Sequence, residues 1–185
     1  MPTTTERPGA ITFRGKPMTL LGPEIELGQA APDFSLTAAG LVPFSLEEAI
    51  DGGNQIAVLI TVPSLDTPTC ALETSTFHAR RAELPAGIAA FIVSVDLPFA
   101  QARWAGANQA EEGLSYLSDY RDHSFGRAYG VAIKELDLLA RAVFVVKRDR
   151  TIGYRQLVTE VSGEPNYDEV FAALRTIAVE GRGAS

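Results

Sequence analysis

Three short segments of this chain are almost entirely apolar, rich in β-branched residues and without alternation of polar and apolar positions. They cover residues 55–62, 89–95 and 142–146. Runs of this kind are typical of central strands that are covered on both faces of a sheet. The pattern over residues 152–158 predicts one more strand.

Helical patterns fall between and after these strands. They lie at about residues 69–84, 99–107 and 166–178. Strands that alternate with helices in this way indicate an α/β domain. Near the start, two strand-like runs at residues 11–14 and 18–21 flank Gly15-Lys16-Pro17. Because Gly and Pro favour turns, a small N-terminal β-hairpin is expected there.

The length and composition of the chain suit a single globular domain with a sizeable core. The chain has 185 residues, of which 46% are hydrophobic and 21% are charged. There is no internal repeat or long linker, so residues 1–185 are predicted to form one domain. About ten residues at the start, 1–10, and the Gly-rich end, 181–185, are expected to be flexible termini.

The charge balance argues against two classes of partner. The chain has 16 Lys and Arg residues against 23 Asp and Glu residues, a formal net charge of -7. This is the wrong sign for a sequence-independent nucleic-acid binder or for binding to an anionic membrane. No run approaches the roughly 20 apolar residues of a spanning helix, and residues 1–10 contain no apolar signal-peptide core. A cytoplasmic location is therefore predicted.

The single cysteine, Cys70, limits the possible sulfur chemistry. One cysteine cannot form an internal disulfide, and with only His78 and His123 beside it there is no Cys/His cluster for a structural zinc. Neither histidine has a paired acidic residue that would suggest catalysis, so both are predicted to be surface or local packing residues. No redox metal, flavin or haem cofactor is expected.

Cys70 follows a polar loop and begins a helical pattern, immediately after the apolar run 55–62. Thr67 is a good N-cap residue and Pro68 suits the first helical position, which would place Cys70 in the first turn. The helix dipole and the unpaired N–H groups there favour thiolate over thiol. A lone cysteine is more commonly a small buried hydrophobe. The polar loop before it favours the reactive interpretation, and a purely structural role is the alternative.

Several motifs resemble those of one known family. Pro63-x-x-x-Thr67-x-x-Cys70 resembles the active-site signature of the peroxiredoxins, and the whole segment 63–70 is similar to its thiol peroxidase version. Further blocks resemble that family in the same order, at residues 12–17, 94–103, 128–133, 139–146 and 164–167. The resemblance therefore covers most of the chain.

The resemblance implies a thioredoxin-like α/β fold, with a central mixed sheet flanked by helices and an N-terminal β-hairpin. It also implies a homodimer that reduces hydrogen peroxide and organic hydroperoxides without a cofactor. In that reaction the Cys70 thiolate attacks the terminal peroxide oxygen, which gives a sulfenic acid and water or an alcohol. The partners would be the hydroperoxide and an external thiol reductant, with thioredoxin as one candidate.

The resemblance also assigns tasks to individual residues. Thr67 would hydrogen-bond the peroxide oxygens at the thiolate, Pro63 would shield the sulfur from water, and Arg141 would stabilise the thiolate and polarise the O–O bond. The alternative for Arg141 is an arginine at a strand end that merely extends to solvent. Glu73, one turn after Cys70, is expected to complement the charge of the helix start.

One position departs from the family pattern. Many thiol peroxidases carry a second, resolving cysteine in an aromatic-Cys-Gly triplet, which here reads Trp104-Ala105-Gly106. Without a second sulfur, the intramolecular disulfide cannot form. The leading hypothesis is therefore a one-cysteine peroxidase that an external thiol recycles.

Three other functions are alternatives to this hypothesis. The alternative of a different class is a non-catalytic peroxide sensor or redox-regulated binding protein on the same fold. A thiol–disulfide oxidoreductase is disfavoured because the chain lacks a Cys-x-x-Cys motif. A structural thioredoxin-like domain is disfavoured because the peroxiredoxin motif residues occur together.

Overall fold

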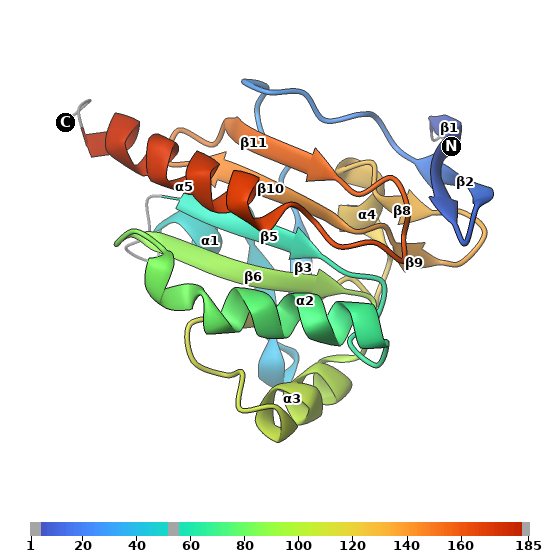
Figure 1. Ribbon diagram of the computed structural model, residues 1–185, viewed down its shortest axis with the longest axis horizontal. Helices are drawn as coiled ribbons and strands as arrows, with labels where there is room; N and C mark the ends of the chain where they lie inside the picture. The colour runs from blue at the N-terminus through green and yellow to red at the C-terminus, as the bar shows by residue number, and fades with distance from the viewer. Residues whose placement is uncertain (1–4, 52–55, 183–185) are drawn as a thin grey trace.

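The computed structural model describes residues 5–51 and 56–182, in which strands and helices alternate along most of the chain (Figure 1). The strands are β1 (Glu6–Phe13), β2 (Lys16–Leu21), β3 (Ser35–Thr37), β4 (Pro43–Ser45), β5 (Ile56–Thr61), β6 (Ile88–Ser94), β7 (Ser115–Ser118), β8 (Ala132–Ile133), β9 (Leu138–Leu139), β10 (Ala142–Lys147) and β11 (Ile152–Leu157). The helices are α1 (Leu46–Asp51), α2 (Pro68–Ala79), α3 (Pro98–Ala107), α4 (Ser124–Ala128) and α5 (Tyr167–Arg182), with short 3-10 turns at Ala39–Leu41 and Arg81–Glu83.

The main sheet has seven strands in the order β11-β10-β5-β6-β7-β3-β4. The central strands β5, β6 and β7 run parallel, while β10 is antiparallel to both β5 and β11. The hairpin β1-β2 continues through β8 and β9 into a separate four-stranded sheet. The expected α/β class is confirmed, with a central mixed sheet flanked by helices.

The main sheet separates two apolar cores. Alternate residues of β10 enter opposite cores: Phe144 packs with residues of α1 and α4, and Val143 packs with residues of α2, α3 and α5. Figure 1 shows α2 and α5 in front of the sheet and α1 and α4 behind it. Burial on both faces explains why β5, β6 and β10 are apolar at nearly every position, since each buried aliphatic side chain contributes about 1.5–3 kcal/mol.

The long elements lie close to their predicted ranges. The four predicted strands are β5, β6, β10 and β11, and the three predicted helices are α2, α3 and α5. Gln55, the first residue of the expected strand 55–62, lies outside the described residues. The helix expected to reach residue 84 is shorter, because α2 ends at Ala79 and a 3-10 turn follows it.

The N-terminal hairpin is confirmed, but its turn differs from the expected Gly15-Lys16-Pro17. The turn consists of Arg14 and Gly15, whose φ angles are 51° and 75°. Two-residue hairpin turns that match the twist of the strands need positive φ at both positions, and Gly adopts such angles at little cost. Lys16 and Pro17 therefore already belong to β2.

Strand β1 begins within the segment that was expected to be a flexible terminus. Glu6 pairs with Leu21, and Arg7 pairs with Leu20. Arg7 also donates through Nε to the carbonyl of Gly22, and through its guanidinium to the carbonyl of Gly130. The expectation of a flexible segment up to residue 10 was therefore wrong from Glu6 onward. At the other end, α5 extends to Arg182.

Candidate active site at the start of helix α2

Cys70 lies in the first turn of α2, as the sequence predicted. Strand β5 ends at Thr61, a short loop follows, and the helix begins with Pro68. Thr67 has the extended backbone of an N-cap residue, with φ -107° and ψ 145°, and its carbonyl accepts the first helical hydrogen bond, from Ala71 N at 2.9 Å. The sulfur is thus placed beside the N–H groups of a helix start, which lack intrahelical acceptors.

The Thr67 side chain does not cap the helix. Its Oγ1 donates to the carbonyl oxygen of Ser64 at 2.9 Å, and its backbone N–H donates to the same oxygen at 3.1 Å. The hydroxyl is exposed at the protein surface, unlike the sulfur. Because its proton is directed at Ser64, the Thr67 oxygen has lone pairs available to accept a further hydrogen bond.

Arg141 reaches the sulfur of Cys70. The residue lies immediately before β10, and its Nη2 is 3.3 Å from Cys70 Sγ. Both residues are buried, each with an exposed fraction of 1%. The alternative in which Arg141 extends to solvent is therefore wrong. A guanidinium this close to the sulfur can donate a hydrogen bond to it and can stabilise negative charge that develops there.

Glu73 is the residue of this cluster that the sequence interpretation missed. It was expected to complement the helix start, but its exposed fraction is 0% and its Oε2 accepts a hydrogen bond from Arg141 Nη1. Glu73 follows Cys70 by three positions, so both side chains lie on one face of α2. That spacing was the available signal. The charge that Glu73 complements is the guanidinium of Arg141.

Burial and neighbouring charges have opposite effects on the pKa of Glu73 and on the pKa of Arg141. Burial raises the pKa of Glu73 to about 7, although the charge of Arg141 and its hydrogen bond lower it. Burial lowers the pKa of Arg141, but the charges of Glu73 and Cys70 outweigh this effect, and the net change is upward. The guanidinium therefore stays charged between the carboxyl group and the sulfur.

One further contact defines the position of the guanidinium. Arg141 Nη2 also donates to the carbonyl of Val161 at 3.3 Å. Nε of Arg141 and Oε1 of Glu73 are buried without a hydrogen-bond partner among the described residues. The cluster is thus held by hydrogen bonds that Nη1 and Nη2 donate, and the Nη2 edge of the guanidinium meets the sulfur.

The remaining residues that the sequence analysis singled out lie on several elements. Pro63 is buried in the loop before α2, where its neighbours Val62 and Leu65 belong to the same apolar core as Cys70. Ala105, at the position of a resolving cysteine, is buried on α3. His78 is half-buried on α2, and His123 precedes α4, so neither is part of the cluster around the sulfur.

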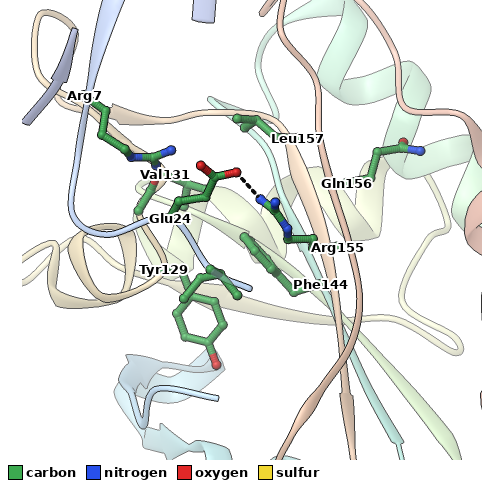
Figure 2. A pocket seen from close by; sticks show the side chains of 10 residues that line it. Arg7, Glu24, Tyr129, Val131, Phe144, Arg155, Gln156 and Leu157 are labelled. Carbon is green, nitrogen blue, oxygen red and sulfur yellow. Dashed lines mark hydrogen bonds and ion pairs between the residues drawn. The ribbon is translucent and has the colours of Figure 1, made fainter. Parts of the chain in front are cut away.

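A pocket elsewhere on the molecule is distinct from this cluster (Figure 2). Arg7, Glu24, Tyr129, Phe144 and Arg155 are among the residues that line it, and Arg155 Nη1 binds Glu24 Oε1 at 2.6 Å. Phe144 belongs to the core on the sheet face opposite Cys70. The pocket is therefore separated from the sulfur by the main sheet.

The described residues offer neither a metal site nor a membrane-spanning helix. Within residues 5–51 and 56–182, there is no group of three or more Cys, His, Asp or Glu side chains that could hold a metal ion. In the same part of the chain, no helix combines the length and the apolar character needed to cross a membrane. The cytoplasmic location stays a prediction.

Comparison with known proteins identifies the family of this chain. Residues 26–171 match the Redoxin family. A thiol peroxidase from Clostridium acetobutylicum is 47% identical over 163 residues, which are 88% of this chain and 96% of that protein. A thiol peroxidase from Bacillus subtilis is 41% identical over 167 residues, which are 90% of this chain and 97% of that protein.

A solved structure extends the similarity to three dimensions. The crystal structure of a peroxiredoxin-like protein from Aquifex aeolicus has a TM-score of 0.82 and 35% sequence identity, and the match covers 94% of this chain and 98% of that one. The expected thioredoxin-like fold is thereby confirmed. The match in sequence and the match in fold together show that this chain belongs to the Redoxin family and, within it, to the thiol peroxidases.

Proposed function

We propose that this protein reduces hydrogen peroxide and organic hydroperoxides through the thiolate of Cys70. The thiolate attacks the terminal peroxide oxygen, an S–O bond forms and the O–O bond breaks. Sulfur is oxidised by two electrons, and the remaining oxygen leaves as water or an alcohol after it gains a proton. The observation that carries the proposal is the 3.3 Å contact between Arg141 Nη2 and the sulfur of a cysteine in the first turn of a helix.

Each neighbouring group has a task in this reaction. Arg141 stabilises the thiolate and the charge that develops on the leaving oxygen, because a buried, fixed guanidinium acts strongly where water is excluded. Thr67 accepts the peroxide O–H with its free lone pairs, since its own proton is donated to Ser64. Pro63 limits the access of water to the sulfur.

We infer a one-cysteine cycle for the recovery of Cys70. The sulfenic acid is attacked by an external thiol, which gives a mixed disulfide and water, and a second thiol then releases the Cys70 thiolate. Thioredoxin is one candidate reductant. Because Cys70 is buried in the reduced state, the start of α2 must move before a bulky thiol can reach the sulfur. The absence of a second cysteine also keeps a peroxide sensor as the second candidate function.

A homodimer is part of the proposal. Leu97 and Phe99, at the start of α3, are exposed by 51% and 65%, and Leu72 of α2 is also exposed. Arg103 of α3 lies 3.7 Å from Asp66, which ties this helix to the loop before α2. Exposed apolar side chains of this size favour a protein interface. Sedimentation of the Phe99→Glu variant should show a shift toward monomer, with Val179→Glu on α5 as the control.

Intact mass measured after one equivalent of hydroperoxide tests the peroxidase function. The wild type should gain one oxygen at Cys70 and return to its starting mass with excess thiol, and this cycle should repeat. Cys70→Ser should gain no oxygen. A single stoichiometric oxidation without turnover, under every thiol tried, would instead identify the protein as a sensor.

A further inference from the structure

Asp96 connects the loop in front of Cys70 to the neighbouring strand. It lies just after β6, and its carboxylate reaches across to the loop after β5. Oδ1 accepts a hydrogen bond from Ser64 Oγ at 2.7 Å, and Oδ2 accepts one from the Leu65 backbone N–H at 2.8 Å. The contact is possible because β5 and β6 are parallel, so both loops leave the same edge of the sheet.

The carboxylate of Asp96 is itself held in place from several sides. Its Oδ2 also accepts from Ser94 Oγ at 2.8 Å, and its backbone carbonyl accepts from Ser118 Oγ at 2.5 Å. Buried Gln101 of α3 donates to Ser94 Oγ at 3.0 Å and to the carbonyl of Leu117 at 2.9 Å. Asp96 is therefore anchored to β6, β7 and α3 before it contacts the loop.

Ser64 is hydrogen-bonded both to Asp96 and to Thr67. The Ser64 side chain binds Asp96, and the Ser64 carbonyl oxygen accepts both the backbone N–H and the hydroxyl of Thr67. The direction of the Thr67 hydroxyl thus depends on the orientation of the Ser64 peptide group. Fixing that peptide group also fixes the backbone that leads into Pro68 and the first turn of α2.

We propose that Asp96 is a positioning residue for the peroxidase reaction. It holds Ser64 and Leu65 so that the Thr67 hydroxyl and the first turn of α2, which carries Cys70, keep fixed positions. It contacts neither the sulfur nor the peroxide, and it acts only through the loop. The inference rests on the proposed role of Cys70 as the nucleophile.

The Asp96→Asn variant tests this role, because an amide has only one oxygen to replace two acceptors. The amide oxygen can still accept from the Leu65 N–H, and the amide N–H can donate to a reversed Ser64 hydroxyl, but both bonds to the loop lose the negative charge of the carboxylate and become weaker. Oxidation of Cys70 by hydrogen peroxide, followed by quenched-flow mass measurement, should slow by about tenfold to a hundredfold, since small misplacements of reacting groups have effects of this size.

Asp119→Asn is the matched control. Asp119 also accepts hydrogen bonds through its carboxylate, from the backbone N–H groups of Phe125 and Gly126 at 3.1 and 2.8 Å, but it supports α4 instead of the Cys70 loop. Hydrogen exchange should rise several-fold over residues 63–71 in Asp96→Asn, and over residues 119–128 in Asp119→Asn. Only Asp96→Asn should slow oxidation.

Ser64→Ala supplies a second test, because it removes the Oγ contact and keeps the carbonyl acceptor. If the two residues act through one connection, the combined Ser64→Ala and Asp96→Asn variant should slow oxidation by less than the product of the single effects. Equal oxidation rates and equal exchange over 63–71 in wild type and Asp96→Asn would overturn the inference. If hydrogen peroxide does not oxidise Cys70 in the wild type, the proposed function is overturned. The exchange measurement then tests only whether Asp96 holds the loop 63–71 in place.

Discussion

Arg141 Nη2 lies 3.3 Å from Cys70 Sγ, although the two residues are 71 positions apart in the chain. The same guanidinium binds Glu73, which follows Cys70 by one helical turn. The cation is thereby placed between a carboxyl group and a sulfur that are both buried. In such a site, the electrostatic effect of one fixed charge on a reacting sulfur is much larger than at the surface.

Arg141→Lys should slow the oxidation of Cys70 by about a hundredfold, the typical effect of losing one directed donor to a developing charge. Lysine keeps the charge but cannot bind Glu73, Val161 and the sulfur with one planar fork. The rate is measured by stopped-flow mixing with hydrogen peroxide. Arg155→Lys, whose ion pair with Glu24 lies on the other face of the sheet, should leave the rate unchanged. A similar rate in wild type and Arg141→Lys would contradict this assignment.

Thr67→Val should slow oxidation by roughly tenfold to a hundredfold, because it removes the hydroxyl that meets the peroxide and keeps the shape of the side chain. Thr67→Ser keeps the hydroxyl and its bond to the Ser64 carbonyl, so its rate should stay close to wild type. Second-order rate constants for hydrogen peroxide and for a bulky organic hydroperoxide provide the comparison. If valine and serine behave alike, Thr67 has no part in the reaction.

The raised pKa of Glu73 predicts a pH dependence of stability. Burial raises this pKa from 4.5 to about 7, so the native chain binds more protons than the unfolded chain between these values. The free energy of unfolding should therefore fall as pH rises from about 4.5 to about 7. The loss attributable to Glu73 should be on the order of 1–3 kcal/mol.

Glu73→Gln should remove this part of the pH dependence, because glutamine does not titrate. Urea unfolding at closely spaced pH values measures the difference in slope between the two proteins. Glu83→Gln is the control, since Glu83 is a half-exposed carboxyl bound to Arg80, and its pKa is lowered by that bond. Parallel curves for wild type and Glu73→Gln would show that the Glu73 carboxyl does not titrate in this range.

The missing second sulfur predicts which oxidised forms accumulate. After one turnover, Cys70 should persist as a sulfenic acid or as a mixed disulfide with added thiol, because no internal thiol can reduce it. The long-lived sulfenic acid should also be converted to sulfinic acid under excess peroxide. Mass measurement under graded peroxide follows both products.

Ala105→Cys should reduce this over-oxidation if α2 or α3 can move, since both Cys70 and Ala105 are buried in the present arrangement. An intramolecular disulfide should then form, and turnover with a thioredoxin system should rise relative to wild type. Ala107→Cys, an exposed position on the same helix, serves as the control. If wild type resists over-oxidation as well as Ala105→Cys does, the absence of a resolving cysteine does not limit recycling.

Local sequence signals determined the long elements and the location of Cys70. The apolar runs of β5, β6 and β10 can be recognised because these strands are buried on both faces. Thr67 and Pro68 mark the start of α2 through the preferences of the first helical positions alone. Short elements such as β3, β7 and α4 were not predicted, because three to five residues are too few to show a period.

The tertiary structure decided which groups surround the sulfur. A charged residue at position 73 is compatible with a solvated helix face, and only the packing of α2 against β10 and its flanking residues buries it beside Arg141, 68 positions away. Asp96 similarly meets Ser64 and Leu65 only because β5 and β6 are neighbours in the sheet. Helix starts and strand runs depend on residues that are adjacent in sequence, whereas burial and charge pairing depend on segments that the fold brings together. The sequence by itself therefore located Cys70, the proposed nucleophile, at a helix start, and the fold determined the electrostatic environment of its sulfur.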